Sequence, residues 1–543
     1  MLFLARPGLK WCNIDRLANL HSKGDSIVIR LVQYTIMAAV AASFAASPVC
    51  GQVSVVTWHN DNARTGQNLA ETILTPATVN STNFGKKCSY AVDGQVYAQP
   101  LYVPGVSIAG GTHNVIYAAT EHDSVYAFDA DCLSATALWQ TSFLGAGITT
   151  MPCNKKGQPQ CDMTILAPER GVTGTPVIDT TRNTIFVGAQ TVENGVYRQK
   201  LHALDIRTGL ETAGSPVVIT ATAPTNPATT LNPQEVLQRS ALLLLNGVVY
   251  VSMASNDSTN GWLIGYNETT LVQQGVYCVT PNGSLGAIWM GGGGPAVDST
   301  GDIYFNTGNG TFDANTGGSD YSMSLVKLAP GSVPSVMDYF TPSNEAHLSS
   351  RDLDLASGGV ILLPDQPGTF PHEAVVAFKT GEILLLNRDS LGKFNSANAI
   401  QDIKFNRSGY WSTAAYWNGN VYLLGVGGPM TQWTLSNGLL PAAPTHSGPT
   451  SYTYPGATPS ISANVTANAI LWAIETQGQV QGGGPSVLHA YDATNVATEL
   501  YNSNQAGTRD VPGASVKFSV PTIANGKVYI GTQTDVDVYG LLH

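Results

Sequence analysis

The stretch NGVVY, residues 246–250, joins an Asn-Gly step to a short apolar run that ends in an aromatic residue. An Asn-Gly step favours the tight turn of a β-hairpin, and the Val and Tyr residues that follow it favour a strand. The same order of turn, strand and final aromatic recurs along the chain. The clear copies are NVIY at 114–117, NTIF at 183–186, NGVVY at 246–250, GDIY at 301–304, NGNVY at 418–422 and NGKVY at 525–529, and two weaker ones are EAVVAF at 373–378 and NAILW at 468–472.

The eight aromatic ends lie about 45 to 75 residues apart. Repeats of this length that consist of short strands predict the blades of a β-propeller. Further strands flank each copy, such as TPVID at 175–179 before it and LHALD at 201–205 after it. We therefore predict an all-β fold, an eight-bladed β-propeller of four-stranded antiparallel blades in one domain at 52–543, with seven blades as the alternative. A strand near residues 89–92 is expected to complete the last blade and close the ring.

The first 47 residues have the composition of a leader. Four basic residues, from Lys10 to Arg30, precede the apolar run IMAAVAASFAA at 36–46, and small residues follow it. We expect residues 1–47 to be a signal peptide or an N-terminal anchor, and the protein to be secreted or periplasmic.

The rest of the chain is acidic. Without residues 1–47, 21 basic residues stand against 35 acidic ones, a net charge of −14. This balance argues against nucleic acid as a partner. No later stretch of 18 apolar residues occurs, so the mature chain is not expected to span a membrane.

Six cysteines follow the leader. Cys153 and Cys161 bracket the polar loop NKKGQPQ with the spacing of a local disulfide. An exported protein meets an oxidising compartment, where such bonds persist. We predict this pair and, as a second one, Cys88 with Cys132, with buried free thiols as the alternative for each.

The turn ALDIRTG, residues 203–209, resembles the Ala-x-Asp-x-x-Thr-Gly turn in the repeats of quinoprotein dehydrogenases, which use pyrroloquinoline quinone (PQQ). VYAFDAD at 125–131 and LHAYDATN at 488–495 repeat it in altered form. The resemblance covers nearly the whole chain past the leader and implies the same propeller. It does not by itself imply an enzyme, because propellers without catalytic activity share this repeat.

The resemblance implies two metal ligands. In the family a Glu in a segment like Glu-x-Gly-Val holds calcium, and Glu193 begins ENGV at 193–196. A Thr-Gly-Asn segment supplies an Asn ligand, and Asn309 ends TGN at 307–309. Carboxylate and amide oxygens are the ligands that calcium prefers. As single residues, Glu193 also fits an exposed hairpin charge, and Asn309 fits a turn position.

The resemblance also implies catalytic and cofactor-binding residues, if the protein is a dehydrogenase. A Thr-Pro segment leads to the catalytic Asp in the family, and Thr-Pro at 341–342 precedes Asp352 and Asp354. Such a carboxylate takes the proton of an alcohol while a cation polarises the quinone. Arg170 would bind the quinone carboxylates. The two Asp residues also fit loop caps, and Arg170 fits a structural partner of an acidic residue.

Three departures from the family pattern weaken the enzymatic interpretation. The adjacent Cys-Cys pair that covers the quinone is absent, the Trp on which the quinone stacks is expected where GGGGP stands at 291–295, and the segment before the catalytic Asp is replaced by TPSNEAHLSSRDLD at 341–354. We therefore expect an exported binding or scaffold protein without quinone chemistry, whose partner is a protein, a carbohydrate or a small molecule. The alternative is a divergent PQQ- and calcium-dependent alcohol or sugar dehydrogenase. The cofactor stays open, with calcium favoured over PQQ.

Two further segments have no predicted catalytic role. WHNDNARTGQN at 58–68 is polar and is expected to cover one blade. GGGGP at 291–295 lacks the Gly-Lys-Ser/Thr ending of a phosphate-binding loop and is expected to allow a tight entry into a strand.

Overall fold

The Asn-Gly steps form the hairpin turns that the sequence predicts. Asn246 and Gly247 have φ angles of 49° and 81°, and Asn525 and Gly526 have φ angles of 48° and 76°. Two consecutive left-handed residues make the turn whose twist matches that of the paired strands. Asn and Gly adopt this conformation at low cost, which explains why they recur at this point of the repeat.

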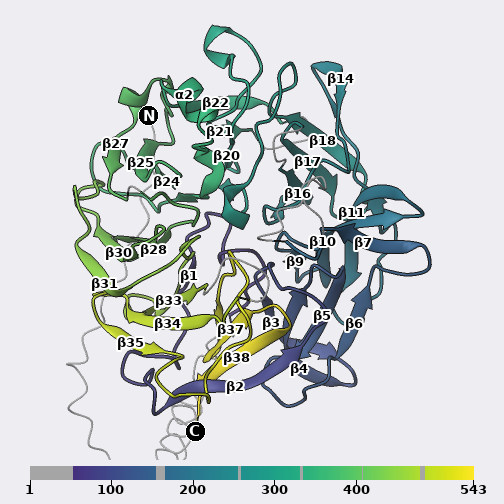
Figure 1. Ribbon diagram of the computed structural model, residues 1–543, viewed down its shortest axis with the longest axis vertical. Coiled ribbons are helices and arrows are strands. Elements are labelled where there is room, and N and C mark those ends of the chain that lie inside the picture. Colours follow the sequence, from purple (N-terminus) through teal and green to yellow (C-terminus); the bar gives the residue numbers. More distant parts are fainter. Residues whose placement is uncertain are drawn as a thin grey trace, which may run out of the picture. The chain divides into compact units, whose positions relative to one another are not determined.

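The computed structural model describes residues 53–153, 166–254, 259–329, 334–406, 408–476 and 483–542. Eight antiparallel sheets in this part of the chain follow one another around a central axis (Figure 1). They are the blades of an all-β propeller, so the eight-bladed prediction is confirmed over the seven-bladed alternative. The predicted leader, residues 1–47, lies outside the described residues.

Each blade has four main strands, numbered here from the axis outward. Blades 1 to 4 contain β3 (Leu101–Ile108), β4 (Gly111–Ala119), β5 (Ser124–Asp129) and β6 (Trp139–Ser142); β9 (Val177–Asp179), β10 (Thr184–Glu193), β11 (Val196–Asp205) and β12 (Val217–Val218); β15 (Leu243–Leu245), β16 (Val248–Met253), β17 (Trp262–Asn267) and β18 (Gln273–Cys278); and β19 (Ala296–Val297), β20 (Ile303–Asn306), β21 (Leu325–Leu328) and β22 (Val336–Thr341). Blades 5 to 8 contain β23 (Val360–Leu362), β24 (Glu373–Ala377), β25 (Glu382–Asn387) and β27 (Gln401–Lys404); β28 (Ala415–Trp417), β29 (Asn420–Leu423), β30 (Pro429–Thr434) and β31 (His446–Ser451); β32 (Ser460–Asn464), β33 (Ala467–Glu475), β34 (Val487–Asp492) and β35 (Glu499–Asn502); and β36 (Thr522–Ala524), β37 (Lys527–Gly531), β38 (Asp535–Leu541) and β2 (Phe84–Ala91).

A few short elements extend the blades. The added strands are β1 (Gln67–Asn68) on β32, β7 (Ile148–Pro152) and β8 (Glu169–Arg170) beside β10, β26 (Lys393–Phe394) on β22, and the separate hairpin of β13 (Thr222–Ala223) and β14 (Asn226–Thr230). The helical segments are α2 (Glu345–Ser350), η1 (Met290–Gly292), η2 (Ala314–Thr316), η3 (Leu355–Ser357) and η4 (Ser396–Asn398). None of the helices in the described ranges is long and apolar enough to cross a membrane.

Blade 8 closes the ring with a strand from the beginning of the propeller. Strand β2 pairs antiparallel with β38, from Phe84 opposite Leu541 to Ala91 opposite Asp535 (Figure 1). The strand predicted near residues 89–92 is therefore confirmed, and it is longer than predicted because it pairs along the whole of β38. The closing strand joins the beginning of the propeller to its end. It pairs with β38, so the last blade has its fourth strand and the ring is closed.

At three of the repeats the final tyrosine joins its blade to the next one. Its hydroxyl group donates a hydrogen bond to the carbonyl oxygen that directly follows the Asp of an Ala-x-Asp turn in the neighbouring blade. The pairs are Tyr117 with Ile206 at 3.0 Å, Tyr422 with Ala493 at 2.6 Å and Tyr529 with Ala130 at 3.0 Å. The two sequence patterns that define the repeat thus meet between blades.

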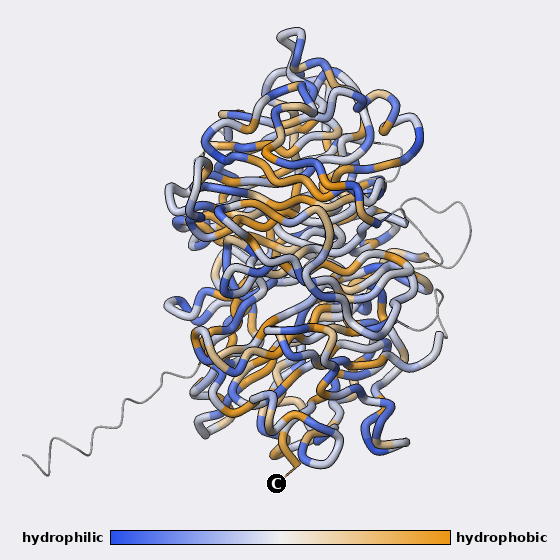
Figure 2. Tube along the Cα trace, turned by 90° about the vertical axis from the view of Figure 1, so that its left-hand side faces the viewer, coloured by the Kyte–Doolittle hydropathy of each residue, from blue (hydrophilic) through white to orange (hydrophobic). Residues whose placement is uncertain are grey.

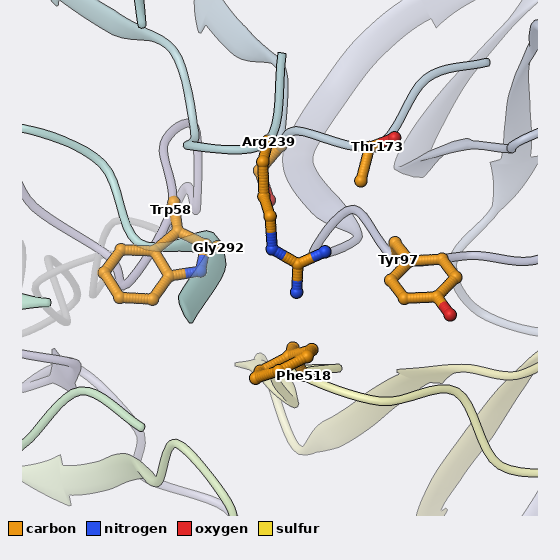
Figure 3. A pocket seen from close by; sticks show the side chains of 7 residues that line it. Trp58, Tyr97, Thr173, Arg239, Gly292 and Phe518 are labelled. Carbon is orange, nitrogen blue, oxygen red and sulfur yellow. The ribbon is translucent and has the colours of Figure 1, made fainter. Parts of the chain in front are cut away.

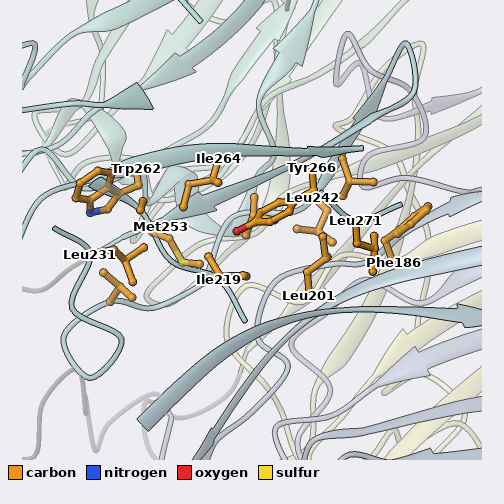
Figure 4. Packing of buried hydrophobic residues seen from close by; sticks show 14 of the residues in the cluster. Phe186, Leu201, Ile219, Leu231, Leu242, Met253, Trp262, Ile264, Tyr266 and Leu271 are labelled. Carbon is orange, nitrogen blue, oxygen red and sulfur yellow. The ribbon is translucent and has the colours of Figure 1, made fainter. Parts of the chain in front are cut away.

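Hydrophobic clusters fill the space between each pair of neighbouring blades. Between blades 2 and 3, Phe186 and Leu201 pack with Trp262 and Ile264, and all four are fully buried (Figure 4). Apolar segments therefore lie in the strands and hydrophilic ones in many loops (Figure 2). A blade covered on both faces needs apolar residues on both, which explains runs such as ILLL at 383–386 in place of alternation.

The polar segment at 58–68 does not cover one blade, as the sequence suggested. Together with residues 55–57 it runs inside the ring along the first strands of the blades, and we call residues 55–68 the axial segment. Because those first strands line the axis, one pass of the segment reaches every blade. In blade order its hydrogen-bond partners are Tyr102, Ile178, Leu244, Val297, Leu362, Tyr416, Ile461 and Ile523.

Arg64 fixes the axial segment from within. The side chain is fully buried, its Nε donates to the carbonyl oxygen of Pro295 at 3.0 Å, and its Nη1 donates to the hydroxyl oxygen of Thr57 at 2.8 Å and the carbonyl oxygen of Trp58 at 2.9 Å. Burial lowers the pKa of Arg64 to about 10, which leaves it charged at neutral pH. The guanidinium therefore satisfies carbonyl groups that have no access to water.

The cysteines agree with one of the two predicted disulfides. Cys88 on β2 is bonded to Cys132, which follows β5, so the predicted pair is confirmed. It links the closing strand of blade 8 to blade 1. Cys161 lies outside the described residues, so the pairing of Cys153 with Cys161 stays a prediction. Cys278 is a buried free thiol.

We expect Arg64→Met to lower the free energy of unfolding by about 3 kcal/mol, because it leaves buried carbonyl groups without donors. Guanidinium chloride unfolding followed by tryptophan fluorescence measures the change. The matched control is Arg351→Met, an exposed position whose substitution should change stability by less than about 0.5 kcal/mol. Equal stability of both variants would contradict a clamping role for Arg64.

Replacing both Cys88 and Cys132 by Ser should cost about 4 kcal/mol, because the bond closes a loop with a sequence separation of 44 residues in the unfolded chain. The unfolding midpoint of the double variant tests this value. Peptide mapping under non-reducing conditions supplies the control, since it should recover the Cys88–Cys132 peptide from the parent protein. Two freely alkylated thiols in the parent protein would show the bond to be absent.

Candidate functional site

All residues that the sequence singled out lie at one end of the ring. Successive strands of a blade run in opposite directions, so the connections after the second and fourth strands gather at the same end. We call this the loop end. Arg170, Glu193, Asn309, Asp352 and Asp354 all stand in such connections, whereas the Asn-Gly turns between first and second strands lie at the other end.

Asn309 and the two Asp residues form one hydrogen-bonded network. The backbone N–H of Asn309 donates to Oδ1 of Asp354 at 2.8 Å, and its side-chain amide donates to Oδ1 of Asp352 at 2.8 Å. Nζ of Lys379, on the loop between β24 and β25, lies 2.8 Å from Oδ1 of Asp352 and 2.5 Å from Oδ2 of Asp354. The structure therefore brings three predicted residues together and adds a lysine that the sequence analysis missed.

The backbone around this network is sterically constrained. A Cβ atom at Gly308 would lie 2.7 Å from Oδ1 of Asp354, so only glycine permits the approach of Asn309 to that carboxylate. Asp352 has a left-handed backbone, with φ of 57°. Oδ1 of Asn309 is buried and has no hydrogen-bond partner among the described residues. Strained or unsatisfied groups of this kind often mark functional sites.

Burial and the lysine act in opposite directions on the two carboxyl groups. Burial raises the pKa of Asp354 above its usual value, against the lowering effect of Lys379. The more exposed Asp352 is also affected by burial, but the hydrogen bonds from Lys379 and Asn309 lower its pKa below the usual value. Burial would lower the pKa of Lys379, yet the two carboxylates raise it. The ammonium group thus stays charged and pairs with both carboxyl groups.

Glu193 belongs to a different network. Strands β10 and β11 pair up to Glu193 opposite Val196, so Glu193 is the last paired residue before the turn. Its carboxylate forms an ion pair with Lys200 and accepts a hydrogen bond from Thr191 at 3.2 Å. Burial would raise the pKa of Glu193, but the hydrogen bond from Lys200 lowers it. The structure gives Glu193 and Asn309 separate partners.

Arg170 is buried next to Glu121. The Arg170 side chain is 1% exposed, and its Nη2 lies 3.1 Å from the sulfur of Met151, while Nε and Nη1 have no partner among the described residues. Oε2 of Glu121 accepts hydrogen bonds from the backbone N–H of Gly171 at 2.8 Å and the hydroxyl of Thr173 at 3.1 Å. Burial raises the pKa of Glu121 to about 7 and lowers that of Arg170 to about 10. The sequence analysis named Arg170 but not Glu121, which follows a regular strand without a motif of its own.

The glycine-rich loop at 291–295 makes room for the axial segment. A Cβ atom at Gly293 would lie 3.1 Å from the Trp58 ring, and one at Gly294 would lie 2.7 Å from Nη2 of Arg64. The loop therefore has to be free of side chains where Trp58 and Arg64 pack on it. The loop itself thus carries no Trp, and the ring that packs against it comes from the axial segment.

A small pocket opens beside Trp58. It is lined by Trp58, Tyr97, Thr173, Thr175, Arg239, Gly292 and Phe518. The guanidinium group of Arg239 extends between Trp58 and Tyr97 and lies over the ring of Phe518, 4.4 Å from its centroid (Figure 3). Arg239 was not predicted, because it stands in an irregular connection with no repeat partner.

Known proteins match this chain in structure rather than in sequence. No protein-family model and no curated protein sequence matches it. A quinohemoprotein alcohol dehydrogenase from Comamonas testosteroni superposes with a TM-score of 0.60 at 15% identity, covering 90% of this chain and 80% of the other. The fold is that of the quinoprotein alcohol dehydrogenases. A quinohemoprotein alcohol dehydrogenase from Pseudomonas putida, at 13% identity with coverage of 90% and 80%, and a europium-containing methanol dehydrogenase, at 14% with coverage of 90% and 98%, each match with a TM-score of 0.56.

The acidic side chains that could bind calcium at the implied site are already paired with lysines. Calcium takes six to eight oxygen ligands, mainly carboxylates. Here Lys200 holds Glu193, and Lys379 holds Asp352 and Asp354. Among the described residues, no group of three His, Cys, Asp or Glu side chains could hold a metal ion. These contacts give no support to calcium, and the assignment of Glu193 and Asn309 as metal ligands stays a prediction.

Lys379→Met should lower the free energy of unfolding by about 3 kcal/mol at pH 7, because it leaves a buried carboxylate unpaired. Protonation removes that charge, and the already raised pKa of Asp354 rises further without the lysine. The folded variant then binds protons more readily than its unfolded chain. The difference in free energy of unfolding between the parent and the variant should therefore shrink as the pH falls.

Guanidinium chloride unfolding from pH 8 to pH 5 measures this dependence. The variant Lys379→Met/Asp354→Asn is the control, since it removes both charges of the buried pair and should recover much of the loss at pH 7. A loss of free energy of unfolding that stays constant over this pH range would argue against charge pairing as the role of Lys379.

Proposed function

We propose that this protein is an exported binding propeller, which has the fold of the quinoprotein alcohol dehydrogenases and holds a ligand at its loop end without quinone chemistry. The observation that carries the proposal is the state of Asp354, one of the two residues, with Asp352, that the resemblance implies as catalytic base. Its Oδ1 accepts the backbone N–H of Asn309, and its Oδ2 faces the ammonium group of Lys379. A general base needs an oxygen within reach of a substrate proton, and both oxygens of Asp354 are engaged inside the protein.

The axial segment supports the same proposal. It fills the centre of the ring with Arg64 and presents Trp58 at the pocket. A mouth lined by aromatic and polar side chains over a packed floor is the usual form of a small-molecule site. The proposed ligand is therefore a small molecule or a carbohydrate rather than a large protein surface.

Export is part of the proposal. The leader-like composition of residues 1–47 and the bond between Cys88 and Cys132 support it, because structural disulfides persist in oxidising compartments. These two features together support a secreted or periplasmic location.

A divergent PQQ- and calcium-dependent alcohol or sugar dehydrogenase is the second candidate. One observation favours it: Asn309 and Asp354, which the resemblance names separately as metal ligand and base, are in direct contact. If PQQ bound, it would supply hydride acceptance from an alcohol. Asp354 would then have to exchange Lys379 for a substrate hydroxyl before it could take a proton.

Reconstitution separates the two candidates. Purified protein incubated with PQQ and calcium chloride should show no alcohol- or sugar-dependent reduction of an artificial electron-acceptor dye. A quinoprotein alcohol dehydrogenase assayed in parallel controls for the cofactor preparation. Dye reduction that requires PQQ and disappears in Asp354→Asn would establish the dehydrogenase and overturn the binding proposal.

A further inference from the structure

One histidine of blade 7 is buried between two carboxylates. His489 on β34 is 2% exposed, its Nδ1 lies 2.6 Å from Oε1 of Glu499, and its Nε2 lies 3.2 Å from Oε2 of Glu475. Glu475 ends β33 and Glu499 begins β35, so this triad connects the second, third and fourth strands of the blade (Figure 1). We propose that the triad is a pH-sensitive lock, which holds the outer strand β35 on blade 7 while His489 is charged and loosens it when His489 loses its proton.

The geometry of the triad favours a charged imidazole ring. An ionised carboxylate only accepts hydrogen bonds, so a ring that faces a carboxylate at each nitrogen needs a proton on both. Burial would lower the pKa of His489, yet the hydrogen bonds to Glu475 and Glu499 raise it above the usual value of 6.5. The imidazolium therefore persists to a higher pH in the folded protein than in the unfolded chain.

Two tyrosines complete the surroundings of the ring. Tyr491 on β34 stacks on His489 with the ring centroids 5.9 Å apart, and the Tyr452 ring lies 5.1 Å from it. Their hydroxyl groups are 2.9 Å apart, and burial raises the pKa of both above the usual value of 10.0. The tyrosines therefore add no charge to the triad. Tyr452 stands in the connection between blades 6 and 7, so the triad borders the loop end.

The same position in blade 2 lacks the second carboxylate. LHAYD at 488–492 and LHALD at 201–205 place a histidine at the same point of the repeat. Nδ1 of His202 also faces a carboxylate, that of Glu211, at 2.6 Å, but its Nε2 is buried without a partner among the described residues. Between these two copies of the motif, the clamp on both ring nitrogens is thus particular to blade 7.

Loss of the proton would remove the attraction that joins the strands. A neutral ring would then separate two mostly buried carboxylates, whose mutual repulsion is poorly screened there. A histidine whose pKa is raised on folding contributes stability below its unfolded value of 6.5 and loses this contribution as the pH rises through its folded value. Strand β35 should therefore be held most firmly in mildly acidic solution and loosen in alkaline solution.

Hydrogen–deuterium exchange followed by mass spectrometry tests the lock. After correction for the intrinsic pH dependence of exchange, peptides that contain β35 should lose protection between pH 6 and pH 9. The loss should be about tenfold for each unit by which folding raises the pKa of His489. Peptides that contain β6 of blade 1 are the internal control. At the position of His489 that blade has Tyr126, whose pKa burial raises to about 12, so their protection should not change.

Two variants test the mechanism. His489→Gln should abolish the pH dependence at β35. Glu499→Gln covers the case in which that variant does not fold: it keeps an oxygen that accepts from His489 but removes the charge, so the loss of protection should be smaller than in the parent. Glu382→Gln is the matched control, because it removes a carboxylate that pairs with Lys404 in blade 5 and should leave the pH dependence at β35 unchanged.

Three results would overturn the lock. They are equal protection of β35 at pH 6 and pH 9 in the parent, an equal loss of protection in the β6 peptides, and an unchanged pH dependence in Glu499→Gln. None of these measurements involves a ligand, so the lock and the proposed function can fail separately.

Discussion

The hydrogen bonds that the axial segment makes with the first strand of every blade are the constraint on which the rest of the structure depends. The first strand of a blade is an edge, and eight such edges face one another across the axis. A single extended segment supplies partners to all of them in one turn around the ring. Arg64 then binds the segment to itself, through Thr57 and Trp58, and to the propeller, through Pro295.

This filled centre shapes the loop end. Trp58 and Arg64 leave no room for side chains at Gly293 and Gly294 in the loop that faces them, and a side chain at Gly291 would collide with the backbone of Trp411. The indole of Trp58 then becomes part of a pocket whose other walls come from blade connections. One segment thus acts both as an internal clamp and as part of the proposed binding surface. Its anchoring through Arg64 keeps that surface rigid, which reduces the entropic cost of binding.

The repeated parts of the fold were predictable from sequence, and the parts that occur once were not. NGVVY and its copies predict blades because the Asn-Gly turn and the final Tyr each have a geometric role, as the left-handed turns and the Tyr422 to Ala493 bond show. The axial segment has no second copy, no alternation and no helical period, so its path around the axis left no pattern. Gly291 to Gly294 suggested a tight backbone but not what approaches it.

The candidate site shows the same division. Asn309, Asp352 and Asp354 were found because the resemblance named them, and they do meet. Lys379 stands in FKTGE, an ordinary turn in the weakest kind of repeat copy, and only the folded chain places it between the two carboxylates. Glu193 matched a short motif, yet the extended pairing of β10 with β11 carries it to a hairpin tip beside Lys200. Local sequence cannot fix how far a hairpin extends, because every additional pair keeps the same alternation.

The loop end therefore contains two charge networks of opposite character. On one side Lys379 pairs with Asp352 and Asp354, and on the other the buried Arg170 interacts with Glu121, whose pKa burial raises to about 7. A general base needs a carboxylate oxygen that is free to accept a proton. In this chain both oxygens of Asp354 are engaged, by the backbone N–H of Asn309 and by Lys379, and the proposed binding role rests on that contact.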